Sequence, residues 1–211
     1  MAQAVSEIAR SIEGVELPPA GTYTIDPAHS SVEFVVRHLL SKARGRFNEF
    51  SGEVVVGEGV EDSSANVEIV AASVNTNQEM RDNHLKSGDF LLAEEHPTIT
   101  FRSNAVRPTG GNTFELDGDL TIRGITKPVT LESEFAGMGV TGQGTPMLGF
   151  SATTSIDREA FDITWNAALE TGGLMLGKKV EIQIDVELLK AEYAGRWEGR
   201  GLRPRPRTRG V

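Results

Sequence analysis

The chain has 211 residues, of which 38% are hydrophobic and 24% are charged, and this composition fits one globular domain. The absence of cysteine excludes disulfides, thiolate zinc sites and thiol catalysis. The net charge is −9, but residues 190–211 contain seven basic and two acidic residues, so the rest of the chain is more acidic than the total indicates. An acidic body repels phosphate backbones, which makes the main domain a poor candidate for binding nucleic acid.

The N-terminal region lacks the pattern of a secretory signal, because its first basic residue is Arg10 and because Glu7 and Glu13 interrupt the apolar residues. No segment has the roughly 20 consecutive apolar residues that a membrane-spanning helix needs. We therefore expect a cytoplasmic protein. Apolar residues recur at helical spacing over residues 4–13, which predicts a short amphipathic helix within an N-terminal extension, residues 1–20.

Beyond Gly21 the apolar period changes to two, which is typical of strands buried on one face. The segment from Ser31 to His38 shows this alternation, and the most regular example runs from Val180 to Leu188, where polar residues fill every second position. The alternating sets are Val32/Phe34/Val36, Val67/Ile69, Ile99/Phe101, Phe114/Leu116, Leu120/Ile122, Val129/Leu131/Phe135 and Val180/Ile182/Ile184/Val186/Leu188. Turn-rich segments separate these strands, so the pattern predicts an antiparallel meander or barrel.

Two local features interrupt the alternation. Gly118 divides an otherwise regular strand and predicts a bulge or bend. The segment from Asn77 to Lys86 is rich in helix formers and predicts a short helical connection, with Met80 and Leu85 packing inward. An eight-stranded barrel is either filled by its side chains or holds one small ligand, and composition alone leaves both alternatives open.

Four blocks of sequence, in consistent order, span most of residues 21–190. They are DPAHSSVEF (26–34) followed by His38, GRFNEFSG (45–52), Thr76 to Phe101 with RDNHLKSGDF (81–90) and HPTITF (96–101), and GDLTIRGITKPV (118–129). Together these blocks resemble the YceI-like, polyisoprenoid-binding proteins, which are also described as lipocalin-like.

This resemblance implies an extended eight-stranded antiparallel barrel over residues 21–190, all-β apart from a short helix near residues 77–87. It also implies a homodimer and a long apolar channel for an isoprenoid or a similar lipid. Family members are often exported, and the chain differs from them in lacking an export pattern. It also has Asp162 where the family usually has glycine, a change that aspartate tolerates because it accepts left-handed backbone better than most residues.

A ligand in such a barrel would contact inward-facing aliphatic and aromatic side chains. The residues that we expect to bind it are Val32, Phe34, Val36, His38, Phe47, Phe50, Phe90, Ile99, Phe101, Phe114, Leu131, Phe135, Phe150, Trp165 and Ile182. The same aromatic residues could instead fill a packed core. No cofactor is expected beyond a bound isoprenoid or other long-chain lipid.

The sequence shows no motif for catalysis or metal binding. The four histidines, His29, His38, His84 and His96, lack the spacing of a metal site, and no nucleophile elbow or phosphate-binding loop is present. His38 continues the inward register of its strand. The cluster from Arg81 to His84 offers an acid–base pair, but we favour a role in tying the helical connection to the barrel.

The C-terminal segment, residues 191–211, is rich in arginine and poor in apolar residues, which predicts a disordered tail. Such a tail could contact an anionic membrane surface or remain a solvated extension.

Three hypotheses about function follow. The first is non-enzymatic binding, storage or transport of a long apolar lipid, such as a polyisoprenoid, an isoprenoid quinone or a long acyl chain or amide. The second is an enzyme that acts on a lipid or quinone, with His38 or His84 as the proton-transfer group. The third is a filled barrel that binds a protein partner, which predicts no internal cavity.

Overall fold

The protein is described by a computed structural model that covers residues 10–12, 15–168 and 174–191. In chain order its elements are β1 (Arg10–Ile12), β2 (Val15–Leu17), β3 (Gly21–Ile25), β4 (Ser31–His38), β5 (Ser41–Phe47), β6 (Phe50–Val56), η1 (Val60–Asp62), β7 (Ser64–Val70), η2 (Ala71–Ser73), β8 (Val74–Asn75), α2 (Glu79–Lys86), β9 (Thr98–Gly110), β10 (Thr113–Ile122), β11 (Ile125–Val140), β12 (Pro146–Asp157), η3 (Arg158–Phe161) and β13 (Leu176–Lys190).

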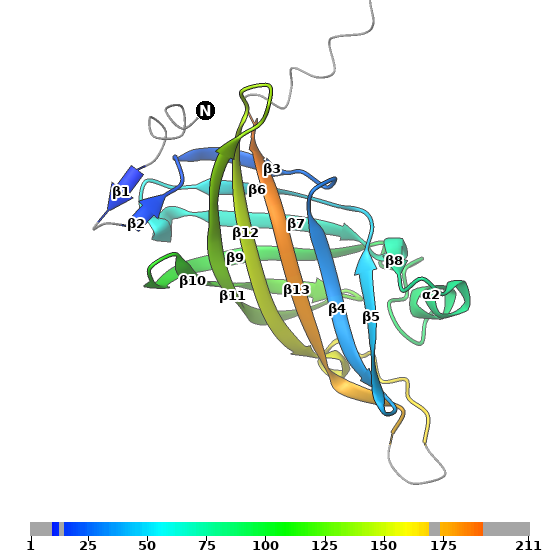
Figure 1. Cartoon of the computed structure of the whole chain (residues 1–211). Helices are drawn as coiled ribbons and strands as arrows, with labels where there is room; N and C mark the ends of the chain where they lie inside the picture. The colour runs from blue at the N-terminus through cyan, green and yellow to red at the C-terminus, as the bar shows by residue number, and fades with distance from the viewer. Residues whose placement is uncertain (1–9, 13–14, 169–173, 192–211) are drawn as a thin grey trace, which may run out of the picture.

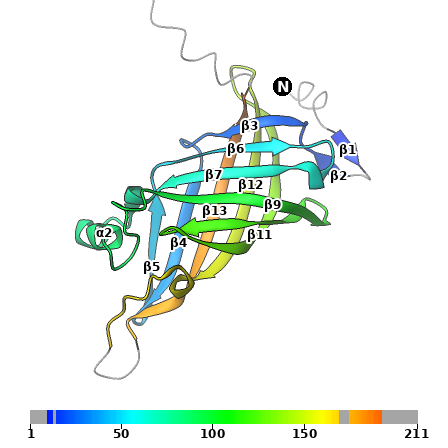
Figure 2. The same ribbon diagram turned by 180° about the vertical axis from the view of Figure 1, so that it is seen from behind.

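The strands close into an antiparallel barrel of eight strand positions (Figures 1 and 2). Around the ring the hydrogen-bonded order is β12, β11, β10, β9, β7, β6, β3 and β13, and β13 also pairs with β12 over Met147–Asp157, which closes the ring. Three of these positions consist of two consecutive strand segments each: β3 with β4, β5 with β6, and β7 with β8. Outside the ring order given above, β4 pairs with β13 and β5, and β5 pairs with β8. The predicted all-β, eight-stranded barrel is confirmed.

A packed core lies where β3, β12 and β13 meet. Tyr23, Leu148 and Leu188 are completely buried there, Leu188 lies opposite both Leu148 and Ile25, and the Tyr23 hydroxyl donates to the Pro19 carbonyl at 2.9 Å. Burial of such large side chains supplies the main stabilisation of the barrel.

The predicted irregularity at Gly118 is confirmed, because the register between β10 and β9 shifts between Asp117 and Gly118. A β-carbon at Gly118 would lie 2.5 Å from the Arg102 carbonyl oxygen and 2.6 Å from the Phe101 ring. Gly45 is covered in the same way by the ring of Phe34. Glycine therefore lets these two rings lie flat against the neighbouring strand, where the sheet curves.

We expect Gly118→Ala to lower the free energy of unfolding by about 1–3 kcal/mol, because the added methyl group meets a backbone carbonyl that cannot rotate away. Urea denaturation would measure the change. Gly142→Ala is the matched control, since a β-carbon at that position would have no atom within 4 Å and stability should be unchanged. Equal stability of the two variants would contradict this account of Gly118.

The predicted helical connection is confirmed as α2, which the Gln78 side chain caps by accepting from the Arg81 amide. Leu85 is half-buried and packs against the core, as expected. The inward packing of Met80 is wrong, because this side chain is 79% exposed. Met80 lies at the edge of the cavity that Leu85 also lines, but five positions along a helix correspond to a rotation of about 140°, which leaves Met80 largely in solvent.

The helix predicted over residues 4–13 is wrong where the structure describes it. Residues 10–12 form β1, which pairs with β2 in a small antiparallel sheet. A helix this short is marginal without a packing surface, so strand pairing prevails over weak helical spacing. The rest of that predicted helix lies outside the described residues, as does the tail from residue 192 onward.

Asp162 ends η3 in the left-handed conformation, with φ 59° and ψ 24°. Asp162 therefore adopts the left-handed backbone that we expected aspartate to accept here. Its carboxylate lies 3.6 Å from the Arg123 guanidinium, so Asp162 also forms an ion pair between η3 and the turn after β10.

Candidate functional site: an apolar cavity inside the barrel

The barrel contains a cavity of about 750 Å³, which is open to solvent and is lined by the inward faces of its strands and by α2 at one end. This volume lies within the range of about 300–1,000 Å³ that is usual for sites that bind small molecules. The hypothesis of a completely filled barrel is therefore not supported.

β13 shows how the sequence produces this cavity. Its five apolar residues at alternate positions, Val180, Ile182, Ile184, Val186 and Leu188, all line the cavity. The intervening residues from Glu181 to Glu187 do not, because successive side chains of a strand point to opposite faces. The strand therefore gives one apolar wall to the interior and one polar wall to solvent.

Fourteen of the fifteen residues predicted to bind a ligand line this cavity. They are Val32, Phe34, Val36, His38, Phe47, Phe90, Ile99, Phe101, Phe114, Leu131, Phe135, Phe150, Trp165 and Ile182. The exception is Phe50, which lies on the same face of β6 as Val54 and Val56 and is buried, but is not among the lining residues. The prediction that Phe50 contacts a ligand in this cavity is therefore not supported. Alternation identifies the inward face of a strand, but it does not identify which inward residues reach open space.

Further lining residues were not predicted as ligand contacts. Those on strands include Val67, Ile69, Leu116, Leu120, Ile122, Val129 and Ile184, and their alternation is visible in the sequence. Gln78, Arg81 and Leu85 reach the cavity from α2 and the residue that caps it, and no periodic signal marks these residues. Gln78 and Arg81 bring polar groups to this end of a mostly apolar space.

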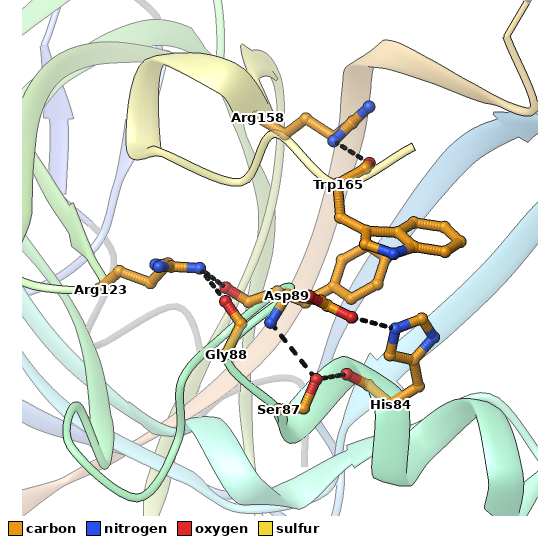
Figure 3. A network of polar contacts seen from close by, with 8 residues as sticks. His84, Ser87, Gly88, Asp89, Arg123, Arg158 and Trp165 are labelled. Atoms are coloured by element: carbon orange, nitrogen blue, oxygen red, sulfur yellow. Dashed lines mark hydrogen bonds and ion pairs between the residues drawn. The ribbon is translucent and has the colours of Figure 1, made fainter. Parts of the chain in front are cut away.

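An aromatic cluster lies at this end, where α2 meets the segment after η3 (Figure 3). The His84 ring contacts Phe90 and Trp165 edge to face, with centroid distances of 4.9 and 4.8 Å, and the Phe90 and Trp165 centroids are 5.3 Å apart. The Asp89 carboxylate lies 2.8 Å from His84 Nε2 and fixes the orientation of the ring. The cluster joins two separate segments across this end of the cavity.

Hydrogen bonds hold α2 and the following loop against the barrel. Asp82 accepts from the amide and hydroxyl of Thr76, and the Arg81 guanidinium donates to the Thr76 hydroxyl at 2.7 Å and to its carbonyl at 2.8 Å. Arg123 donates to the carbonyls of Gly88 and Phe90 at 2.7 and 2.8 Å (Figure 3). The predicted role of the cluster from Arg81 to His84 in tying the helical connection to the barrel is confirmed.

Arg158 is a buried cation, only 3% exposed, at the start of η3. Its Nε donates to the Gly177 carbonyl at 2.9 Å, and its Nη1 donates to the carbonyls of Trp165, also at 2.9 Å, and Ile163. Among the described residues no carboxylate pairs with it. One guanidinium therefore joins the start of β13 to the segment that carries Trp165 (Figure 3).

The four histidines occupy separate places, as predicted. His38 lines the cavity, His84 belongs to the aromatic cluster, and His96 packs on Gly124, where its ring lies 2.8 Å from the position of a β-carbon. His29 lies in the bend between β3 and β4, where its Nδ1 is 2.8 Å from the Asp26 carboxylate. Asp26, His29 and Glu187 have side-chain ligand atoms within 4.8 Å of one another, an arrangement that the hydrogen bonds of this bend explain.

We expect nuclear magnetic resonance titration to show a pKa for His29 above its ordinary value of 6.5. The hydrogen bond to Asp26 is the main cause, and the charges of Asp26 and Glu187 add to it. Because folding raises this pKa, the ion pair stabilises the fold below pH 6.5, and the stabilisation disappears as the pH rises through the folded pKa. Asp26→Asn should return the pKa toward 6.5, whereas an unchanged pKa would contradict this cause.

Comparison with known proteins agrees with the fold. The model of the YceI-like domain matches residues 23–188. A UPF0312 protein of Staphylococcus aureus strain USA300 is 42% identical over 175 residues, which cover 81% of this chain and 98% of that protein. The chain therefore belongs to the YceI-like family.

Solved structures show the same architecture. BcnA of Burkholderia cenocepacia is 27% identical, with a TM-score of 0.69 over 77% of this chain and 98% of that one. A YceI protein of Campylobacter jejuni is also 27% identical, with a TM-score of 0.63 over 72% and 86% of the two chains. A polyisoprenoid-binding domain from Saccharophagus degradans shares the fold at 14% identity, with a TM-score of 0.62 over 80% and 98%.

In the part of the chain that the structure describes, every helix is too short or too polar to cross a bilayer.

Proposed function

We propose that the protein binds a long apolar lipid in the barrel cavity, without catalysing a reaction on it, and so stores or transports the lipid. The observation that carries this proposal is the cavity of about 750 Å³ with its aliphatic and aromatic lining. A polyisoprenoid, an isoprenoid quinone and a long acyl chain or amide all have the apolar, elongated shape that such a lining accepts.

The energetics favour such a ligand. Each methylene group moved from water into a dry apolar site contributes about 0.8 kcal/mol, before the cost of association is subtracted. A long chain can therefore bind tightly with few polar contacts. The polar residues near α2, including Gln78, Arg81 and His84, are placed to contact a head group, while residues such as Phe34, Phe101 and Ile182 contact the chain.

The comparisons support this proposal at the level of fold. The domain from Saccharophagus degradans is described as polyisoprenoid-binding, and it shares this barrel architecture. A barrel of this type is therefore compatible with an isoprenoid ligand, and the apolar lining of the present chain supplies the independent support.

The alternative of a lipid- or quinone-modifying enzyme depends on the two histidines that line the cavity, His38 and His84. Catalysis predicts that His38→Ala or His84→Ala removes turnover of a bound quinone while ligand retention survives. Binding alone predicts no turnover in the unaltered protein.

Tryptophan fluorescence tests the proposal in solution. The chain has two tryptophans, so Trp197→Phe leaves Trp165, which lines the cavity, as the sole reporter. We expect saturable quenching by an isoprenoid quinone, and competition by a long-chain polyprenol or fatty amide. Absence of any saturable response to all three probes would contradict lipid binding in this cavity.

A further inference from the structure

The end of the molecule formed by the β4–β5 hairpin and the start of β13 exposes leucines to solvent. Leu40 is fully exposed, and Leu39 and Leu174 are 39% and 43% exposed. The Leu39 amide donates to the Met175 carbonyl at 2.8 Å, which brings the hairpin against the start of β13. In Figure 1 these segments together reach the lower end of the barrel. We call this region the leucine tip.

Basic residues lie along the strands that form the leucine tip. The sequence from Phe34 to Asn48 contains four basic residues and no acidic one, and two adjacent lysines follow at the start of β13. These basic residues are Arg37, Lys42, Arg44, Arg46, Lys178 and Lys179, and all six are exposed. They represent six of the fourteen basic residues before residue 190, a part of the chain that has 28 acidic residues. Four acidic residues, Glu33, Asp157, Glu159 and Glu181, lie beside these basic residues, so the region has a small net positive charge on an acidic body.

Among the described residues, half of these cations, the three arginines, are not in an ion pair, whereas two lysines are. Lys42 pairs with Glu181 at 3.3 Å and Lys178 pairs with Glu159 at 2.6 Å. Within the described ranges, Arg37, Arg44 and Arg46 form no ion pair with an acidic side chain. On β5, Lys42, Arg44 and Arg46 alternate with cavity-facing positions, so their side chains share the outer face.

The cavity extends to the same end of the molecule. Val36, His38 and Ala43 of the hairpin line it, together with Met175 and Leu176 from the β13 side. Exposed leucines, exposed cations and the wall of an apolar cavity therefore occur together on one pair of adjoining segments.

We propose that the leucine tip docks the protein on the surface of an anionic lipid bilayer. The exposed leucines enter the interfacial layer, and the cations along these strands contact anionic head groups, a combination that suits a peripheral membrane contact. The inference goes beyond the proposed function, because it assigns the surface through which an apolar ligand would exchange with a bilayer. Docking itself does not require that a ligand be bound.

Vesicle flotation with the full chain tests this inference. We expect binding to vesicles of phosphatidylglycerol and phosphatidylcholine in equal parts, weaker binding in about 0.5 M salt, and little binding to pure phosphatidylcholine. Each cation near such a surface changes partitioning by about fivefold, so Arg37→Gln/Arg44→Gln, which removes the two unpaired arginines nearest the turn, should lower it by more than about tenfold. Leu40→Ser should lower it by up to about tenfold, because one exposed apolar side chain is removed.

Arg102→Gln/Lys127→Gln is the matched control, since it removes two exposed cations from β9 and β11, away from the tip. This control should retain most of the binding. Equal losses in both double variants would show non-specific attraction, and full binding by both would place the contact elsewhere, such as in residues 192–211. Either result, or the absence of any vesicle binding, overturns the proposal.

A second copy of the chain is the competing occupant of the tip. If Leu40→Ser shifts the oligomeric mass in light scattering while vesicle binding is unchanged, the surface is a protein interface and the proposal is wrong. Lipid retention, measured by organic extraction of the same variants, reports separately on the proposed function, so the two can fail independently.

Discussion

Replacement of Phe101 by aspartate is expected to abolish lipid retention. Phe101 is 7% exposed, lies on β9 and lines the cavity, so the new carboxylate would lie in apolar surroundings. Burial of an unpaired charge costs several kcal/mol, and water drawn in to solvate it would occupy the space of the ligand. Organic extraction followed by mass spectrometry should recover less than about a tenth of the lipid that the unaltered protein carries.

Two further variants separate loss of the site from loss of the fold. Gln183→Glu adds the same formal charge on the outer face of β13 and should retain the lipid in full. Ala152→Phe places a ring in the cavity without any charge and should reduce uptake of long ligands. If Phe101→Asp unfolds cooperatively like the unaltered protein and still retains all of its lipid, the ligand binds elsewhere.

The second large effect concerns Arg158. We expect Arg158→Ala to lower the free energy of unfolding by about 3–5 kcal/mol, because three carbonyls lose their donor at a buried position. The loss should also loosen the segment that carries Trp165, since that segment is joined to β13 through this guanidinium. Urea denaturation and the Trp165 emission in a Trp197→Phe background would measure the two effects.

Arg158→Lys is the informative companion, because an ammonium group keeps the charge but cannot reproduce the planar fork that reaches several carbonyls. We expect it to restore only part of the stability. Arg102→Ala removes an exposed arginine and should change stability little. A loss of less than about 1 kcal/mol for Arg158→Ala would contradict the role assigned to its hydrogen bonds.

The sequence predicts much of this fold because the barrel follows from a period of two. On β13 the apolar residues from Val180 to Leu188 identify the cavity wall, since one face of each strand is in contact with the interior. Gly118 identifies the bulge, because only glycine fits between the Arg102 carbonyl and the Phe101 ring. These signals are local, and local geometry is what a sequence pattern reports.

Other features depend on contacts that no local pattern contains. Phe50 shares its face with Val54 and Val56, which line the cavity, yet it does not line the cavity itself. Residues 10–12 form a strand because β2 pairs with them. Arg158 has no periodic signature, although it joins η3 to residues as far away as Gly177. The open volume itself depends on how all the inward side chains pack together.

Native mass spectrometry of the purified full chain, paired with organic extraction, tests the central claim most directly. We expect one long apolar lipid for each chain, either carried from the expression host or taken up from added polyprenol, isoprenoid quinone or fatty amide. The same spectra give the mass of the assembly and so test the homodimer that the family resemblance implies. A protein that carries no lipid and takes up none of these three probes would contradict lipid binding as its function.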